Sequence, residues 1–357
     1  MDPLSNVLSL VKPRSYVSGG LTAGGRWAIR FPAYDGIKCY VVTKGECWVG
    51  IAGVAEPVQL STGDCLMLPH GRAFGLCSDL HAPPVDVTAL YSGGPYNGIR
   101  ALAPGDAFFL LGGHFVLDGN ADILRSVLPP FLHLRNESDK RALRGSVERM
   151  MEELRDPQPG GFLIAQQSAY TMLVLALRLC LARGERGGVG WLYALADKQI
   201  ARAIAIMHEQ HAASWTVETL AETAGMSRTT FAERFRRTVG TSPIEYLTQW
   251  RMLIAGDRLR HSDDSISMVS RLVGYESESA FGAAFKRAIG TSPRAYRRAV
   301  STAAGAAAKA PTGSQPVVPP SAARIRSPGQ SPAPTLPRTG NSASPRTRRA
   351  RIPRTRA

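Results

Sequence analysis

The chain has 357 residues and a formal net charge of +15, which is enough length for two or three domains. Its five cysteines are odd in number and form no CxxC pair; this favours reduced thiols over a disulfide framework. The longest apolar stretch, Tyr170–Ala182, contains Arg178 and is shorter than the roughly 20 residues that span a bilayer. The first residues contain no export signal. We therefore expect a cytoplasmic protein without a membrane partner.

The positive charge is unevenly distributed. Residues 1–190 hold 18 Lys and Arg against 17 Asp and Glu, and residues 191–300 hold 15 against 11. Residues 301–357 hold ten and no acidic residue. This excess favours a polyanionic partner.

Residues 1–135 are expected to form a small all-β barrel or sandwich, because short apolar runs alternate with Gly, Pro and Asp. The preceding Gly-rich segment "SGGLTAGGRW" (18–27) is expected to be a flexible arm, since no helix pattern follows that would make it a phosphate loop. The expected strands are Arg26–Phe31, Ile37–Gly45, Cys47–Gly53, Pro57–Leu60, Asp64–Pro69 and Val85–Tyr91.

The segment "GDCLMLPHGRAF" (63–74) resembles the second cupin motif, and "RWAIRFPAYDGIKCYVVTKGECWV" (26–49) resembles the strands before it. The resemblance implies a cupin-like domain that binds a small-molecule effector. It departs from the cupin pattern at the metal ligands: Phe74 stands where the motif commonly ends in His, and Cys39 and Tyr40 occupy a region where a ligand His is usual. We therefore expect no metal and no other cofactor.

Aromatic residues in the barrel could line a ligand pocket, because such pockets are mostly apolar. The alternatives are ordinary barrel core for the aromatic residues and a surface turn for His70. The four cysteines before residue 80 could form a redox sensor, but buried small apolar residues fit them better. The candidate effector-binding residues are Arg30, Tyr40, Trp48, His70 and Phe74.

Residues 136–190 are expected to be a helical linker with helices at Lys140–Leu154 and Phe162–Arg183. Apolar residues recur on one face of the second helix at steps of three and four. That face could pack onto the barrel or form a dimer interface. Its residues are Phe162, Ala165, Ala169, Leu173, Leu177 and Leu181.

A phrase near residue 240 is repeated fifty residues later: "VGTSPIEY" (239–246) returns as "IGTSPRAY" (289–296). In each copy a Gly is expected to end one helix in the left-handed conformation. Ser-Pro then opens the next helix, with Ser as N-cap and Pro at the first helical position. Glu245 lies three residues after Ser242 and completes a capping box in the first copy.

The repeat extends upstream, because "AGMSRTTFAERF" (224–235) aligns with "VGYESESAFGAAF" (273–285). Each copy reads as a short apolar helix, a Gly turn and a second helix that opens at Ser227 or Ser277. That order predicts a helix-turn-helix whose second helix enters the DNA major groove. The two units fall at about 216–237 and about 265–287, and the apolar helix 243–260 joins them.

Residues 197–299 resemble the DNA-binding domain of AraC/XylS-family transcription regulators. The resemblance implies seven helices, with two recognition helices entering successive major-groove segments roughly 34 Å apart. It also implies a homodimer that binds double-stranded promoter DNA, acts as an activator and has RNA polymerase as a candidate partner.

Phe231 and Phe235 are expected to face the core of the first unit, so the other side of that helix must face outward. The matching outward residues of the second unit are smaller. The candidate DNA-binding residues are Arg228, Thr229, Thr230, Ala232, Glu233, Arg236, Arg237, Ser277, Glu278, Ser279, Gly282, Ala283, Lys286 and Arg287.

Residues 300–357 are expected to be a disordered basic tail, because Pro, Ala, Ser and Arg occur there without an apolar period. We interpret the chain as a sequence-specific regulator without enzyme activity. One alternative is a metal-dependent cupin enzyme fused to DNA-binding helices. The other is a non-specific DNA-binding protein driven by the tail.

Overall fold

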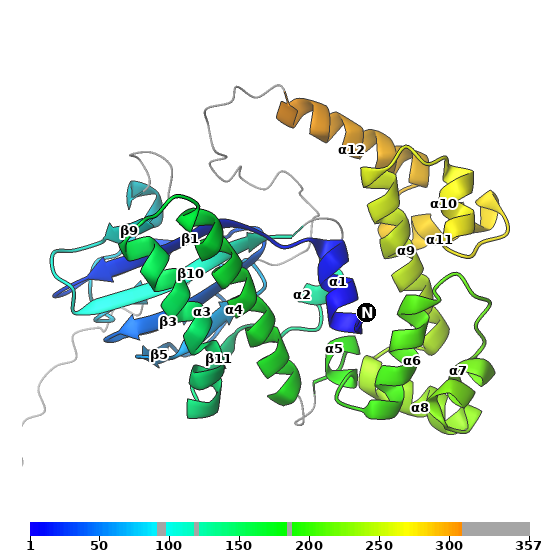
Figure 1. The fold of residues 1–357 in the computed structure, drawn as a ribbon, viewed down its shortest axis with the longest axis horizontal. Helices are drawn as coiled ribbons and strands as arrows, with labels where there is room; N and C mark the ends of the chain where they lie inside the picture. Colours follow the sequence, from blue (N-terminus) through cyan, green and yellow to red (C-terminus); the bar gives the residue numbers. More distant parts are fainter. Residues whose placement is uncertain (91–97, 118–120, 184–187, 309–357) are drawn as a thin grey trace, which may run out of the picture. The chain divides into compact units, whose positions relative to one another are not determined.

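The computed structural model describes residues 1–90, 98–117, 121–183 and 188–308. The first part of the chain is rich in β-strands and the last part is entirely helical (Figure 1). The expected fold class, a cupin-like β region followed by helical DNA-binding units, is confirmed.

Two sheets build the barrel (Figure 1). Neighbouring strands are antiparallel apart from the pairs β1–β9 and β2–β8, which are parallel. The six-stranded sheet has the order β11 (Leu132–Leu134), β6 (Cys65–Leu68), β3 (Ile37–Lys44), β10 (Phe108–Val116), β1 (Arg14–Ala23) and β9 (Gly98–Ala101). The five-stranded sheet has the order β5 (Val58–Ser61), β4 (Glu46–Ile51), β7 (Phe74–Cys77), β2 (Ala28–Phe31) and β8 (Val85–Asp86).

Successive side chains on β3 point to opposite faces of its sheet. Tyr40 and Val42 pack in the apolar core between the two sheets, whereas Cys39 and Val41 pack in a second core that includes the helices beneath the sheet. Five expected strands are present. The sixth, Val85–Tyr91, is mostly wrong: only Val85–Asp86 pairs, and Val87–Leu90 forms a 3-10 helix, η1.

The first part of the segment expected to be a flexible arm, Ser18–Ala23, instead belongs to β1, which lies between β10 and β9 in the six-stranded sheet. Its glycines allow this position: a Cβ added at Gly20 would lie 2.7 Å from the Phe109 ring. Glycine in a strand often marks such a close approach. The local composition suggested flexibility because it contains no information about the partner strands.

The sequence interpretation missed helix α1 (Pro3–Val11). Asp2 is its N-cap and accepts a hydrogen bond from Ser5 N, and Pro3 is its first residue. An Asp-Pro pair before an apolar run is a helix-start signal, so the sequence did contain the information. A further short helix, α2 (Asp122–Arg125), precedes β11.

Helices α3 (Glu137–Arg155) and α4 (Gly161–Arg183) confirm the two expected linker helices and lie across the six-stranded sheet (Figure 1). By length and composition α4 could cross a membrane. However, Ala165, Ala169 and Leu173 are fully buried in the core shared with the sheet. Such burial is typical of a core helix. The same burial agrees with packing of this face onto the barrel, and the dimer interface stays a prediction.

Seven helices follow between Lys198 and Ala308, as expected. The long helix α9 joins two groups of helices (Figure 1). Tyr246 and Trp250 pack with Phe231 and Phe235, whereas Met252 and Leu259 pack in a separate core with Phe281 and Phe285. The helices are α6 (Lys198–Glu209), α7 (Val217–Ala224), α8 (Arg228–Val239), α9 (Pro243–His261), α10 (Ile266–Leu272), α11 (Glu278–Ile289) and α12 (Pro293–Ala308), with α5 (Trp191–Ala194) before them.

Helix α12 continues to Ala308, so the expectation of disorder from residue 300 was wrong for its first nine residues. This segment is rich in Ala, the best helix former, and the next proline is Pro311. Residues 309–357, which hold all ten positive charges of the expected tail, lie outside the described part of the chain.

Candidate nucleic-acid interface

Two helix-turn-helix units form where the repeat predicts them. In the first, α7 ends at Gly225, which has φ 67° and ψ 41°, and α8 follows three residues later. In the second, α10 is followed by Gly274 with φ +80°, and a Cβ there would lie 2.4 Å from the carbonyl oxygen of Ala212. The left-handed backbone at both turns requires glycine, as expected.

Two buried phenylalanines in each unit determine which side of the recognition helix faces the core. Phe231 and Phe235 on α8, and Phe281 and Phe285 on α11, are completely buried. The opposite side of both helices is therefore directed to solvent. Ala232 and Gly282 are half-buried, and the other twelve candidate DNA-binding residues are exposed.

The start of each recognition helix is held by its N-cap. Ser227 Oγ accepts a hydrogen bond from Thr230 N at 3.3 Å and donates one to Thr230 Oγ1 at 2.9 Å. Ser277 Oγ accepts from Ala280 N at 3.2 Å. The hydroxyl of Thr230 already serves the cap, so Thr229 is the freer of the two threonines for a base contact.

Some arginines of α8 bind other side chains of the domain, and others are exposed and could contact DNA. Arg234 donates to Asp197 at 2.6 Å and to Gln199 at 3.1 Å, which ties α8 to the start of α6. Arg228 forms an ion pair with Glu218. Within the described residues Arg237 has no carboxylate partner, whereas Arg236 interacts electrostatically with the carboxylate of Glu245. Both arginines are exposed, and exposed arginines can bind phosphates.

One basic residue was missed at the second recognition helix. Arg294 Nη2 lies 3.5 Å from Glu278 at the start of α11, so its charge stands beside the candidate residues. The signal was visible in the repeated phrase, because Ile244 occupies the matching position in the first copy. An acidic residue at the start of α11 is thereby partly neutralised.

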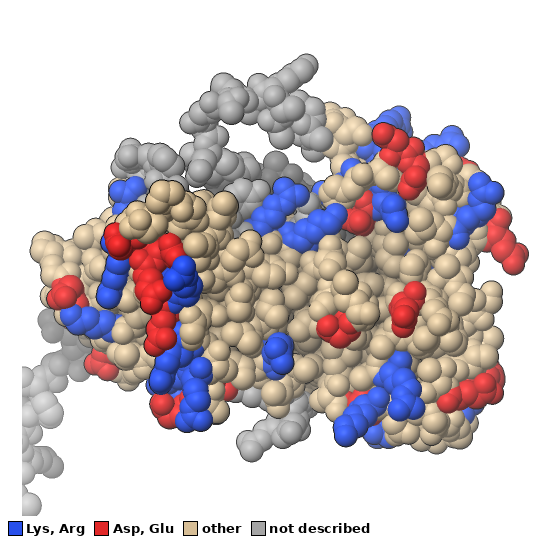
Figure 2. Space-filling model, in the orientation of Figure 1, with Lys and Arg blue, Asp and Glu red and all other residues tan. Residues whose placement is uncertain are grey.

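The electrostatic surface is mixed rather than uniformly basic. On the side drawn in Figure 2, Lys and Arg form separate groups that alternate with Asp and Glu.

The candidate effector residues do not form one site. Tyr40 and Phe74 lie together in the barrel, with ring centroids 6.0 Å apart. Arg30 is exposed on the outer face and pairs with Asp86 at 3.6 Å, and Trp48 points away from the core formed by its neighbours Cys47 and Val49. His70 Nε2 lies 3.0 Å from the carbonyl oxygens of Leu128 and Pro129, so it holds a turn in place. These three residues therefore lie apart from Tyr40 and Phe74, because strand alternation turns Arg30 and Trp48 outward. Their role in binding an effector stays a prediction.

The cysteines behave as apolar core residues. Cys39, Cys47, Cys65 and Cys180 are buried, and none of these described residues forms a disulfide. Burial raises the pKa of Cys47 to about 12, so its reactive thiolate form is rare at neutral pH. Among the described residues no group of three or more His, Cys, Asp or Glu is arranged to hold a metal ion.

A β-barrel followed by two helix-turn-helix units on one connecting helix defines a helix-turn-helix DNA-binding protein. A Cupin family model matches residues 2–182 and a helix-turn-helix domain model matches residues 220–299. The chain is 41% identical over 300 residues to an AraC-like transcription regulator of Streptomyces lividans, with 84% of this chain and 98% of the relative covered. It belongs to the AraC family of transcription regulators.

A more distant relative and a solved DNA-binding domain also align with this chain over most of their own length. The transcriptional regulator AlkR of Acinetobacter baylyi is 27% identical over 308 residues, which cover 84% of this chain and 99% of AlkR. The DNA-binding domain of the global transcriptional factor AdpA, solved in complex with a target DNA, is 39% identical. That comparison covers 29% of this chain and 93% of the solved domain, with a TM-score of 0.28.

Proposed function

We propose that this regulator reads a promoter through α8 and α11 and responds to a small molecule bound in its cupin-like domain, acting as an activator in the bacterial cytoplasm at the nucleoid. The observation that carries the proposal is the pair of solvent-facing recognition helices, each fixed by two buried phenylalanines. The division that we propose is a sensor at 1–135, a linker at 136–190 and a DNA-binding domain at 197–299. Residues 309–357 would add contacts to phosphates through their positive charge.

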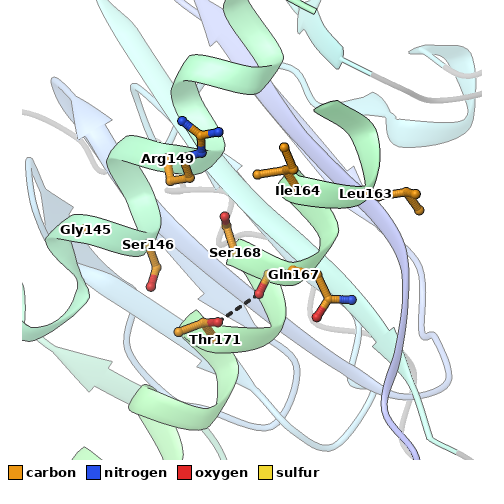
Figure 3. Close-up of a pocket in the computed structure, with 8 residues that line it drawn as sticks. All are labelled: Gly145, Ser146, Arg149, Leu163, Ile164, Gln167, Ser168 and Thr171. Carbon is orange, nitrogen blue, oxygen red and sulfur yellow. Dashed lines mark hydrogen bonds between the residues drawn. The ribbon is translucent and has the colours of Figure 1, made fainter. Parts of the chain in front are cut away.

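We also propose a homodimer that uses the side of α4 facing away from the barrel. Leu163 is 64% exposed and Ile164 is 37% exposed there. They border a shallow groove of about 410 Å³ between α3 and α4 (Figure 3). Arg149, which also lines this groove, already forms ion pairs with Glu152 and Glu153. Since this arginine is neutralised within the chain, the groove favours an apolar partner such as the same helix of a second copy.

Glu233 is expected to read a base, because it is exposed on α8 and a carboxylate can accept a hydrogen bond from a cytosine amino group in the major groove. We expect Glu233→Ala to relax the preference at one or two base pairs and to cost about 1–3 kcal/mol on the best site. Sites selected by each protein from random duplex DNA would measure the change.

The matched control is Glu222→Ala, which removes the same charge from the exposed surface of α7 outside the recognition helix. It should alter affinity for all sequences alike and leave the selected motif unchanged. If Glu233→Ala and the parent select identical motifs, Glu233 does not read a base.

A further inference from the structure

The barrel contains a lysine that is surrounded by aromatic rings. Lys38 Nζ lies 4.4 Å from the ring centroid of Tyr34, 4.6 Å from that of Phe31 and 5.2 Å from that of Phe74. These three rings, which we call the aromatic collar, come from β2, β7 and the segment between β2 and β3. Phe31 and Phe74 stack with centroids 4.3 Å apart, and Tyr34 is fixed by a hydrogen bond that its hydroxyl donates to the Leu68 carbonyl at 2.8 Å.

The amine has no counter-charge within the described residues. None of the described carboxylates forms an ion pair with Lys38. The carboxylate of Asp35 forms an ion pair with Arg125, with Oδ1 3.1 Å from Nη1. His114, the register partner of Lys38 on β10, is neutral at pH 7 because burial lowers its pKa to about 4. Lysine side chains are rarely placed in such surroundings without a partner.

Burial lowers the pKa of Lys38 to about 7. About half of its side chains are then neutral amines at pH 7, compared with fewer than about one in a thousand for an ordinary lysine. A desolvated lysine in an apolar pocket is a recognised way to make an amine nucleophilic. Lys38 is half-buried and not completely enclosed, so part of its side chain contacts solvent.

We propose that Lys38 is a covalent capture site for small aldehydes. The Nζ lone pair attacks the carbonyl carbon and forms a C–N bond, while the proton lost from nitrogen is taken up by the carbonyl oxygen. The resulting carbinolamine loses water and leaves an imine. No oxidant or reductant is consumed, and water reverses the step. Phe31 and Phe74 are themselves buried, so the aromatic collar keeps water from the amine and does not contact the aldehyde.

If the captured aldehyde is the effector, this inference rests on the proposed sensing function of the barrel. The chemical capture at Lys38 does not depend on that function. The two can therefore fail separately, and the experiment needs one chemical readout and one DNA-binding readout.

The experiment treats the full chain with benzaldehyde and sodium cyanoborohydride at pH 7, which reduces an imine to a stable secondary amine, and locates the label by peptide mass spectrometry. Lys38 should be labelled at least about tenfold faster than Lys44, which lies on the same strand, is exposed and pairs with Asp106 at 2.8 Å. Lys38→Arg should abolish the fast label, because guanidinium does not form the imine. Lys44→Arg should leave it intact.

Labelling of Lys38 no faster than that of Lys44 would overturn the proposal, and this comparison on the parent needs no variant to fold. The proposal would also be overturned if the protein bound benzoate at Lys38 but was not labelled there by benzaldehyde. That result would indicate a simple anion site. If Lys38 is labelled but binding to a selected DNA site is unchanged, the capture site stands and its role as effector site fails.

Discussion

At the scale of single residues, the DNA-binding domain depends on a buried aromatic group around His208. The His208 ring stacks on Trp250 with centroids 3.7 Å apart, and its Nε2 lies 2.8 Å from the Tyr246 hydroxyl. Tyr246 is the last residue of the first repeated phrase. The phrase therefore not only starts α9 but also supplies a contact between α9 and α6.

Burial lowers the pKa of His208 to about 3, so we expect acid to destabilise the protein at this residue. The unfolded chain binds a proton here below about pH 6.5 and the folded chain does not, so the unfolding free energy falls as pH falls from about 6.5 to 3. The slope should be about 1.4 kcal/mol per pH unit. Urea denaturation followed by tryptophan fluorescence at several pH values would measure it.

The matched comparison is between His208→Gln, which cannot titrate, and His81→Gln, whose side chain is 79% exposed. The first variant should show a shallower loss of stability in acid than the parent, and the second should follow the parent. Parallel pH profiles for His208→Gln and the parent would show that His208 does not titrate in this range.

At the scale of elements, the helix ends were predictable because their signals are local. The capping box of Ser242 and Glu245 is present, with Ser242 N donating to the Glu245 carboxylate at 3.1 Å. Gly240 and Gly290 are left-handed at φ 87° and φ 84°. Strand β1 and the aromatic collar could not be predicted in the same way, because both depend on pairing between strands that are distant in the sequence.

Gly240→Val should weaken DNA binding more than it reduces helix content. A β-branched residue is strained in the left-handed region by about 1–2 kcal/mol. A Cβ at Gly240 would also lie 2.9 Å from Val189 Cγ1. Both effects would shift the start of α9, and with it the separation of α8 and α11. Affinity for a selected site and the circular dichroism spectrum would be compared.

The control is Gly50→Ala on β4, where a Cβ meets no atom within 4 Å and the backbone is not left-handed. It should preserve both affinity and helix content. Unchanged affinity in Gly240→Val would mean that α9 does not depend on this glycine for its alignment.

At the scale of the whole molecule, sequence repetition predicted the DNA-binding architecture better than it predicted the sensor. Phe231 in the first unit corresponds to Phe281 in the second, and Phe235 corresponds to Phe285. All four phenylalanines are buried. In the barrel, strands were recognised from their apolar pattern, but that pattern did not show that Arg30 and Trp48 lie on the outer side. One residue of register decides which face a side chain occupies, and short strands do not fix that register by composition alone.

The central claim is that α8 and α11 read two segments of one duplex through the rigid connection made by α9. Selection of bound sites from random duplex DNA by the full chain tests this most directly. The account predicts an enriched motif with two blocks of preferred bases whose centres are about 10–10.5 base pairs apart, with the stronger preference in the block read by α8. Recovery of no preferred sequence, or of a single block without a second at that spacing, would contradict it.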